Sequence, residues 1–499
     1  MPPELLRLLN AGDFGAVVSQ LRNGRLASTP DTAKNAAQYD PKLHEINDPV
    51  KRPDKMVVVD KDSEEYGEVK NINPNVEMTT ETGFRVEKVA RIALAIQKLI
   101  VKRAVAFTFG NPPAYTSDAE DPQEQKILQA IKRIFNDVKE GPLNRKIARS
   151  VFRSQEVAEL WYPVMQKKEH QTYGFPTKYK FKVAIFSPAL GDKLWPYFDD
   201  NRDLVAFSRE FTRKDGDLIT RNYFETYTAD AHYLWTADGE GAADANNWEM
   251  ADGYPKKLTI GKIPIVYANQ EQTEWADVQS LIDRLEKLLS NFADTNDYHA
   301  SPKIFVEGTI KGFARKGEAG AIIEGEEGAK AQYLSWANAP ESVKLEIETL
   351  LRLIYTITQT PDISFDTVKG IGAVSGVALR LLFMDAHLKV QDKCEIFDEY
   401  LQRRCNIVKA YIGQAWQQAE AAAESLIVKP QIIPYIIEDE LGKINILTAA
   451  NGGKQIASRK ETIRRLGWAD DADAEEEAIQ AEEDRESSYE LGEPTLTGF

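Results

Sequence analysis

The sequence predicts an α+β protein in which one antiparallel sheet lies between blocks of helices. Apolar and polar residues alternate from Tyr179 to Ala268, and Gly and Asp turns separate the runs. This period of two is typical of an antiparallel meander. On both sides of it, apolar residues recur at three-and-four spacing, as in amphipathic helices. The chain has 499 residues, too many for one ordinary core, so we expect about two to four packed units.

The region before the meander is predicted to start irregularly and then become helical. Residues 1–80 are polar and rich in Pro, Asp and Lys, so we expect mostly loop there. The apolar spacing from Phe84 onward indicates a helix. The predicted elements are a short helix at 5–9, the helix from 84, a β-rich stretch at 105–109, and helices at 122–139 and 142–158.

Helices and a small β unit are predicted around and after the end of the meander. The last strand, Ile263–Tyr267, contains Pro264, which suits an edge strand because proline donates no ladder hydrogen bond. The longest apolar stripe, from Ser375 to about Trp416, would span roughly 60 Å as one straight helix. The other predicted elements are a helix at 275–292, a β unit at 303–336, a helix from 340 to Pro361, a strand at 427–437, helices at 441–466, and an acidic helix at 470–486 that fades into a disordered tail.

Composition and charge exclude several classes of protein. The chain has 62 Lys and Arg against 78 Asp and Glu, for a formal net charge of −16. A protein that coats DNA needs cations to displace counterions, so this class is disfavoured, whereas an acidic lumen that lets DNA slide past is compatible. No stretch has the ~18 uncharged apolar residues of a membrane helix, and the N-terminus lacks an apolar signal core. We expect a protein made in the cytoplasm or carried inside a particle.

The sequence contains no complete catalytic or metal-binding motif. Gly452-Gly453-Lys454 and Gly261-Lys262 each lack the first glycine and the final Ser or Thr of a phosphate-binding loop, so turns are the better interpretation. Cys394 and Cys405 match no metal spacing and are expected to be packing thiols. The five histidines do not share metal-ligand spacing either; they are His44, His170, His232, His299 and His387. We predict neither an enzyme nor a cofactor.

Two groups of cations are candidates for binding. Lys311, Arg315 and Lys316 cluster in the small β unit, where they could contact phosphates or an acidic protein; a solvated loop is an equally good interpretation. Lys369 stands alone in a Gly-rich loop. In a monomer such a lysine would be unremarkable, but in a ring it becomes a circle of charges, one per subunit.

Four further stretches occur in a fixed order along the chain. They are a helix leading into Phe107-Thr108-Phe109-Gly110-Asn111-Pro112; Gly261–Asn269 followed by a helix with Leu281-Ile282-Asp283; Thr360–Ser364 followed by Ser375-Gly376-Val377-Ala378-Leu379; and Ile456–Thr462 followed by acidic residues. Together they resemble the portal proteins of long-tailed phages, the head–tail connectors with the siphophage-type portal fold. The resemblance extends from about residue 84 to residue 486.

The resemblance implies a portal fold assembled as a ring, usually of about twelve subunits. Its parts are a wing of helices plus antiparallel sheet, a helical stem, a small α/β clip and a helical crown. The implied boundaries are 1–270 for the N-terminal segment and wing, 271–299 and 340–362 for two stem helices, 300–339 for the clip, 363–374 for a tunnel loop, 375–440 for the long wing helix and returning strand, and 441–499 for the crown and acidic tail.

The same resemblance implies the function and the partners. The ring would sit at one capsid vertex of the virion, after assembly in the host bacterial cytoplasm, as a channel for double-stranded DNA in packaging and ejection. The implied partners are other copies of the chain, the major capsid and scaffolding proteins, the terminase large subunit and the head-completion or adaptor proteins, but no membrane. The residues implied to face DNA are Ser364, Asp366, Thr367, Lys369, Gly370 and Gly372, and the possible clip contacts are Lys311, Arg315 and Lys316.

Other functions remain as alternatives to the portal hypothesis. A different head–tail structural protein, such as an adaptor or capsid-associated protein, would differ in stoichiometry. A nucleic-acid-processing enzyme would require a metal-binding carboxylate cluster or a phosphate-binding loop. A monomeric binding module is disfavoured by the long apolar stripes of the predicted helices.

Overall fold

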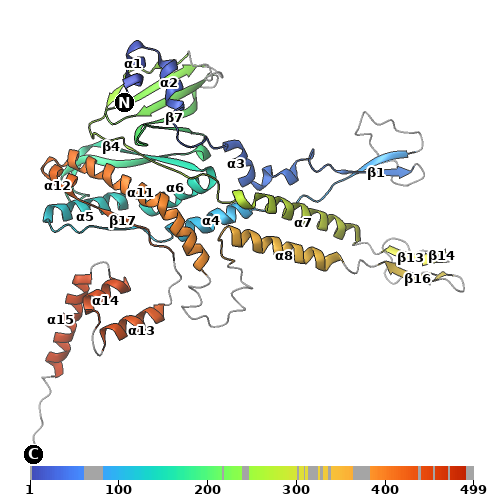
Figure 1. Ribbon diagram of the computed structural model, residues 1–499. Coiled ribbons are helices and arrows are strands. Elements are labelled where there is room, and N and C mark those ends of the chain that lie inside the picture. Colours follow the sequence, from blue (N-terminus) through green and yellow to red (C-terminus); the bar gives the residue numbers. More distant parts are fainter. Residues whose placement is uncertain are drawn as a thin grey trace, which may run out of the picture. The chain divides into compact units, whose positions relative to one another are not determined.

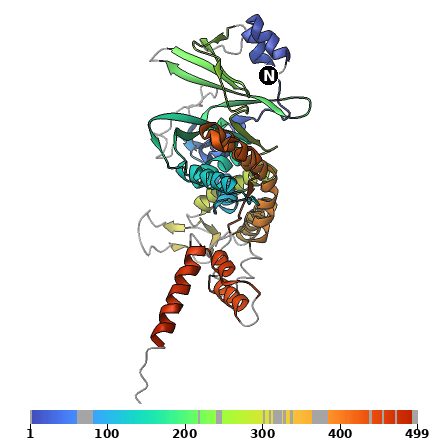
Figure 2. The ribbon, with the colours of Figure 1, turned by 90° about the vertical axis from the view of Figure 1, so that its left-hand side faces the viewer.

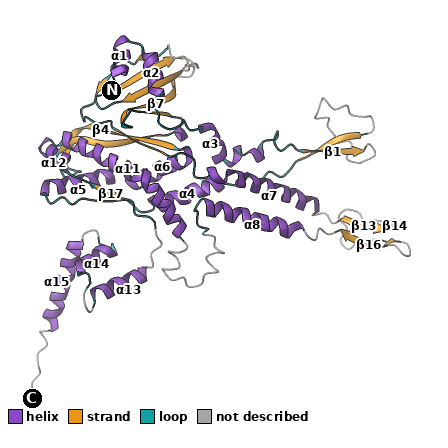
Figure 3. Ribbon diagram, in the orientation of Figure 1, coloured by secondary structure: helices purple, strands orange, loops and turns teal. Residues whose placement is uncertain are grey.

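A computed structural model describes most of the chain, and Figure 1 shows it as a ribbon. The described residues are 3–60, 82–215, 219–238, 247–299, 303–307, 310–312, 324–325, 330–334, 339–362, 383–435, 440–452, 456–469 and 472–490. The chain divides into two compact units, of which the first comprises residues 1–361 and 386–435 and the second 362–385 and 436–499. Helices and antiparallel strands occur together in the first unit (Figure 3), so the predicted α+β class is confirmed.

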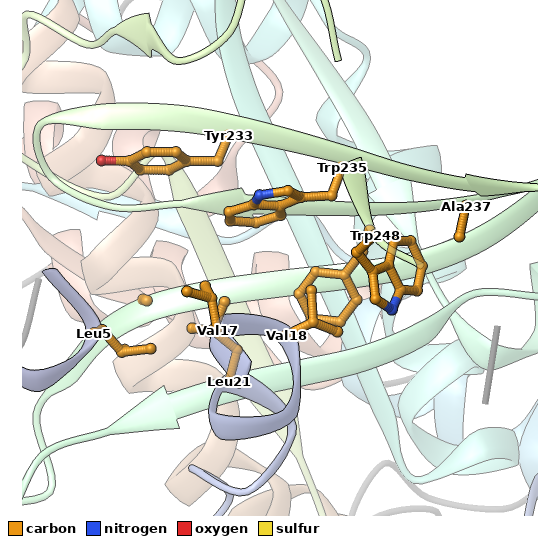
Figure 4. Packing of buried hydrophobic residues seen from close by; sticks show 10 residues of the cluster. Leu5, Val17, Val18, Leu21, Tyr233, Trp235, Ala237 and Trp248 are labelled. Carbon is orange, nitrogen blue, oxygen red and sulfur yellow. The ribbon is translucent and has the colours of Figure 1, made fainter. Parts of the chain in front are cut away.

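The central strands of the predicted meander are confirmed as one antiparallel sheet, and two N-terminal helices pack against it (Figures 1 and 2). The first and last strands predicted for the meander, at 181–185 and 263–267, belong instead to a second sheet. The strands of the first sheet follow the order β10-β9-β8-β7-β6, with β11 beside β9. Their bounds are β6 Lys193–Phe198, β7 Leu204–Asp215, β8 Ile219–Tyr227, β9 Ala231–Asp238, β10 Glu249–Met250 and β11 Lys256–Lys257. Helices α1 (Pro3–Ala11) and α2 (Phe14–Arg22) pack Leu5, Val17, Val18 and Leu21 against Trp235 and Trp248 (Figure 4). The short helix predicted at 5–9 is confirmed by α1, whereas the expected loop is wrong over α2 and over α3 (Thr32–Tyr39).

A second, three-stranded antiparallel sheet lies next to the first. Its order is β12-β4-β5, with β4 at Glu156–His170, β5 at Thr177–Phe186 and β12 at Ile265–Asn269. The edge position predicted for the strand near Pro264 is confirmed, because among the described strands β12 pairs only with β4. Its predicted place is wrong in two respects: the strand begins after Pro264, and it closes this second sheet rather than the meander. One buried cluster joins the two sheets: Phe186 and Ile265 come from the second, Leu194 and Phe207 from the first.

Four helices and a short strand pair complete the core of the first unit. They are α4 (Ile96–Phe109), α5 (Pro122–Asp137), α6 (Glu140–Ser154), α11 (Met384–Ala415), and β3 (Ala114–Thr116) paired with β17 (Lys429–Gln431). Phe397 of α11 meets Phe109 of α4 and Phe152 of α6 edge-on, at centroid distances of 5.0 and 5.9 Å. The predicted strand at 105–109 is wrong, because these residues form the C-terminal end of α4. This end of the helix is buried on most sides, so Val105, Phe107 and Phe109 are all core residues.

The predicted helix from Phe84 begins later, at Ile96. Residues 82–87 form strand β2 (Thr82–Glu87), which pairs with β1 (Lys55–Asp60), and an extended segment follows. That segment lies along α7 (Gln279–His299), and every second backbone amide of it donates a hydrogen bond to a side chain of α7. The Leu94 amide donates to Glu286 at 2.7 Å, the Ile92 amide to Ser290 at 2.9 Å and the Ala90 amide to Asp294 at 2.7 Å. These amides are unavailable for a helix, so the apolar spacing misleads here.

Other element boundaries also differ from the predictions. The helix expected to reach residue 158 ends at Ser154, because Gln155 adopts a left-handed φ of 68° and strand β4 begins. The strand expected at 427–437 is reduced to β17. The long helix is confirmed from Met384 onward, and residues 375–382 lie outside the described residues. Of the two cysteines, Cys405 is buried and Cys394 half-buried, and burial raises the pKa of the Cys405 thiol to about 12.

The second unit is helical in its described part. Its helices are α13 (Glu440–Asn451), α14 (Arg459–Leu466) and α15 (Ala472–Glu490). Helix α14 begins at Ser458, whose hydroxyl accepts from the Glu461 amide at 3.2 Å, as an N-cap does. Arg459 then pairs with Glu483 of α15 at 2.8 Å. The predicted helices in 441–466 and 470–486 are confirmed, and residues after 490 lie outside the description.

Candidate functional site

Helices α7 and α8 (Ala339–Ile357) pack against each other (Figure 1). In the sequence, a small β unit separates them. Buried residues of α7 include Ile282 and Leu285, and those of α8 Leu350 and Ile354. Arg284 of α7 also pairs with Glu346 of α8 at 2.7 Å. Between the helices, β13 (Lys303–Glu307) pairs with β16 (Lys330–Leu334), and β14 (Ile310–Gly312) with β15 (Glu324–Gly325).

The opposite face of α8 is apolar and exposed in a single chain. Leu345, Leu353 and Ile357 are 66%, 41% and 49% exposed. With Thr349 they recur every four residues, so they form one stripe along the helix. A row of large apolar side chains on a helix of a soluble protein indicates a contact surface.

The C-terminal end of α8 is fixed by a left-handed cap. Gln359 adopts a φ of 50°, its amide donates to Thr356 O at 3.1 Å, and the Thr360 amide donates to Tyr355 O at 2.9 Å. This pair of bonds is the Schellman arrangement that ends many helices. The next carbonyl, that of Pro361, accepts from the guanidinium of Arg103 on α4 at 2.6 Å.

The N-terminal part of α11 is held to the same helix end by a buried ion cluster, here called the Glu274 cluster. Lys389 and Lys393 lie one turn apart on α11 and contact the two carboxylate oxygens of Glu274 at 2.7 and 2.6 Å. Lys389 also donates to Thr358 O at 2.9 Å. Burial alone would raise the pKa of Glu274, but the two ammonium groups outweigh it and hold the pKa below its ordinary value.

These contacts anchor both ends of residues 363–382. On one side, Arg103 and Lys389 bind the carbonyls of Pro361 and Thr358. On the other, α11 is fixed through Lys389 and Lys393. The Glu274 cluster has two cations for one acid, so it carries a net positive charge. This cationic surplus lies beside the C-terminal end of α8, where it would attract an anion.

The residues proposed from the sequence are mostly not tested by this geometry. Ser364, Asp366, Thr367, Lys369, Gly370 and Gly372 all lie outside the described residues, as do Arg315 and Lys316. Lys311 lies in strand β14, where only the backbone is described. The sequence analysis missed the anchor residues Arg103, Glu274, Lys389 and Lys393. A weak signal existed in the four-residue spacing of the two lysines.

Two further classes of site are not seen in the described part of the chain. Among those residues, no three His, Cys, Asp or Glu side chains are grouped so that they could hold a metal ion. Across the same ranges, no helix is long and apolar enough to cross a membrane.

A buried polar cluster, here called the Arg404 cluster, joins α11 to α6, β4 and β3. Arg404 is fully buried and binds both carboxylate oxygens of Glu159, at 2.7 and 2.9 Å. It also donates to Glu140 at 3.0 Å and to Asn144 at 2.7 Å, and Tyr115 donates to the same Glu140 oxygen. This closed arrangement of one cation and two acids has no access for a ligand, so we interpret it as a structural element.

Comparison with known proteins identifies the family. The family described as "Phage portal protein, SPP1 Gp6-like" matches residues 85–489, which is most of the chain. The protein therefore belongs to the SPP1 Gp6-like family of phage portal proteins, the head–tail connectors of phage particles. It is a family of structural rather than enzymatic proteins. The portal resemblance found in the sequence is thereby confirmed.

Solved structures were also compared with the chain. A chain from the neck of an empty GTA particle, computed with C6 symmetry, is 10% identical, with a TM-score of 0.40; the alignment covers 74% of this chain and 89% of that chain. A chain from the neck of a native GTA particle, computed with C12 symmetry, is 10% identical, with a TM-score of 0.37, covering 75% and 88%. No curated protein matches the sequence. Family membership rests on the family match.

Proposed function

We propose that the protein forms a closed ring of about twelve copies at one vertex of a phage capsid, around a channel for double-stranded DNA. DNA would pass through it during packaging and again during ejection. The observation that carries the proposal is the family match over residues 85–489. The role is structural: the protein guides DNA and docks other proteins without catalysing a reaction.

The exposed stripe of α8 supports the ring. In a head-to-tail ring, each subunit presents one face to a different face of its neighbour, and the contacts close by rotation. Leu345, Leu353 and Ile357 would then be buried against the next copy, as ridges of one helix fill grooves of another. Residues 271–299 and 340–362 are the stem helices of this ring.

The anchored ends of residues 363–382 support a DNA-facing loop. Residues 363–374 form the tunnel loop in this proposal, with Ser364, Asp366, Thr367, Lys369, Gly370 and Gly372 toward DNA. The anchor allows the loop to move while its ends stay fixed. Lys369 would make brief phosphate contacts in a lumen that otherwise repels DNA.

The other parts of the chain are assigned to partners. Residues 300–339 form the clip, where Lys311, Arg315 and Lys316 would contact the terminase large subunit and later the adaptor proteins. Residues 1–270 and 375–440 form the wing, and 441–499 the crown and acidic tail inside the capsid. The major capsid and scaffolding proteins complete the partners, and assembly takes place in the host bacterial cytoplasm.

The experiment that tests the ring is negative-stain electron microscopy of the purified protein with its mass by light scattering. We expect rings of about twelve copies with a pore wide enough for duplex DNA. The variant Leu345→Glu should be monomeric by light scattering and folded by circular dichroism. Leu190→Glu is the matched control, because Leu190 ends a short 3-10 helix of the first unit and is 69% exposed. It should leave rings intact. Absence of rings even with scaffolding protein present would overturn the proposal.

The tunnel-loop assignment has its own test. The variant Lys369→Glu should assemble into rings but lower the amount of DNA packaged and retained. Unchanged packaging and retention would remove Lys369 from the DNA path.

A further inference from the structure

The N-terminal segment lies outside the residues that match the family, yet it runs along much of the first unit. The family match begins at residue 85. Before it, residues 14–54, here called the strap, contact the first sheet through α2, helix α6 through α3, and α7 through the 3-10 helix at Glu45–Asn47. Asn35 of the strap donates to Gln155 at 2.8 Å, and Trp275 donates to Gln38 at 3.1 Å.

The most buried ion pairs between the strap and the rest of the unit share one polarity. In each of them the cation belongs to the strap and the acid to the family-matched part. The pairs are Arg22–Glu210 at 3.0 Å, Arg25–Glu156 at 2.8 Å, His44–Glu286 at 2.7 Å and Arg52–Asp294 at 2.8 Å. The two pairs of opposite polarity, Asp54–Arg91 and Asp40–Lys98, are more exposed. Glu210 also contacts Lys193 and Asp294 also contacts Lys55, whereas Glu156 and Glu286, the two most buried acids, are paired by the strap. The strap therefore supplies cations to buried acids, whose charge is costly when unpaired.

Two of these acids already hold the extended segment that precedes α4. Glu286 accepts from the Leu94 amide, and Asp294 from the Ala90 amide. Arg52 reaches the second oxygen of Asp294 and also donates to Asn291 at 2.9 Å. One polar row of α7 thus receives the extended segment and the strap together.

Each ring nitrogen of His44 faces an oxygen that accepts a hydrogen bond, which favours a ring with two protons. Its Nε2 lies 2.8 Å from the carbonyl oxygen of Gln38, which can only accept a hydrogen bond. Its Nδ1 lies 2.7 Å from the Glu286 oxygen that also accepts from Leu94, so that oxygen is an acceptor and Nδ1 donates. Both side chains are almost fully buried.

Two further acids lie near His44, and one of them, Glu45, is paired with Lys51. Asp283 lies on α7 one turn before Glu286, and Glu45 follows His44 on its own 3-10 helix. Burial lowers the pKa of His44, but its hydrogen bond and charge interaction with Glu286, the Gln38 carbonyl and Asp283 together raise the pKa above the ordinary value.

We propose that residues 14–54 are a strap that ties α7 to the two sheets, and that the His44–Glu286 pair is its latch. The latch is closed while the imidazole of His44 carries two protons. When His44 becomes neutral, it loses its charge interaction with Glu286 and one of its two donors, so a nitrogen lone pair faces either the Gln38 carbonyl or the Glu286 carboxylate, and the latch opens. The inference concerns a single chain and is independent of the proposed ring. Where α7 is a stem helix, as proposed above, the strap sets the stem against the wing.

The direction of the pH effect follows from the raised pKa. Histidine in the unfolded chain titrates near its ordinary value of about 6.5. The latch therefore stabilises the strap fully below that pH, and the stabilisation is lost as pH rises through the folded value. Between these two pKa values, opening of the strap releases one proton from His44. The equilibrium constant for opening therefore rises by up to about tenfold per pH unit.

The test is hydrogen exchange of the strap in the full chain from about pH 6 to about pH 9, a range that brackets the titration. Each variant is compared with the wild type at the same pH, which cancels the intrinsic pH dependence of exchange. In the wild type, protection of residues 38–52 should fall as pH rises. In Glu286→Gln, which presents no charge to His44, protection should be independent of pH.

Two further variants keep the outcome unambiguous. His44→Gln retains a donor toward Glu286 but does not titrate, so it should also abolish the pH dependence, and it serves if Glu286→Gln fails to fold. Arg52→Gln should lower protection equally at every pH, because arginine stays charged. A wild-type strap whose protection is independent of pH, or a pH dependence that persists in His44→Gln, would overturn the latch. Because exchange is measured within one chain, either result leaves the ring proposal separately testable.

Discussion

The Arg404 cluster and the Glu274 cluster are both buried ion clusters on helix α11, but they are built in opposite ways. Arg404 is one cation among two acids, with hydrogen bonds to Glu159, Glu140 and Asn144. Glu274 is one acid between two cations, Lys389 and Lys393. The first joins four elements deep in the core, whereas the second fastens α11 to the end of α8.

The difference separates a fixed core from an adjustable joint. Arginine holds its partners through a rigid fork of donors and stays charged, so the Arg404 cluster defines a single arrangement. Lysine ammonium groups sit on flexible stems and can follow a moving partner. We infer that the part of α11 around Arg404 serves as a fixed base, and that the part around Lys389 forms an adjustable joint with the end of α8.

Removing the guanidinium should produce the largest effect. Arg404→Leu leaves Glu159 and Glu140 buried without a cation, which should lower the free energy of unfolding by about 3–5 kcal/mol. Arg403→Leu is the matched control: Arg403 is half-buried and donates only to Ile265 O at 3.2 Å, so we expect a loss of about 1 kcal/mol. Urea denaturation followed by tryptophan fluorescence measures both. Equal losses would mean that the Arg404 cluster does not act as the base.

Glu274→Gln should have an intermediate and pH-dependent effect. The pKa of Glu274 is lowered in the folded chain, so its stabilisation is present above the ordinary glutamate value and is lost as pH falls through the folded value. We expect a loss of about 1–3 kcal/mol at neutral pH, shrinking as the solution is acidified. Thermal unfolding over a pH series tests this, with the exposed neighbour Glu271→Gln as control. A loss that stays constant in acid would contradict the ion-pair account.

Replacing Lys389 and Lys393 separately should show which of them holds the end of α8. Lys389→Met removes the hydrogen bond to Thr358 O as well as one ion pair. Lys393→Met removes an ion pair, a long hydrogen bond to Gln270 and a contact with the Phe152 ring, but no contact with Thr358. We expect hydrogen exchange at residues 358–361 to accelerate by about fivefold to tenfold in Lys389→Met, as loss of roughly 1 kcal/mol implies. The change in Lys393→Met should be smaller. The reverse order would show that Thr358 is not part of the joint.

Local patterns in the sequence predicted the fold best where each element buries one face. The meander, the edge strand after Pro264 and helices α7 and α8 all follow their apolar period. Strand β4 was missed because it is the central strand of its sheet, and a run such as Val157–Trp161 reads equally as buried helix. The extended segment before α4 was missed because its amides bond to side chains of α7, which local spacing does not encode.

The sequence predicted a loop at 363–374, which lies outside the described residues, but not the contacts that flank it. Glycines and a proline indicated a loop after Pro361, but the anchor depends on residues brought together by tertiary folding. The spacing of Lys389 and Lys393 places both on one helix face. Their acid, Glu274, lies far earlier in the chain, in a link between a strand and a helix, and no local pattern pairs them.

The smallest predicted effect concerns the cap of α8, which fixes the joint without any charge. Gln359 holds a φ of 50°, where a side chain crowds the following carbonyl and glycine does not. Gln359→Gly should therefore be more stable than Gln359→Ala by about 1 kcal/mol, the Ala variant being the control that keeps Cβ. Thermal unfolding of the two variants measures the difference. If Gly were no better than Ala, the left-handed cap would contribute nothing to the end of α8, and the joint would rest on its ions alone.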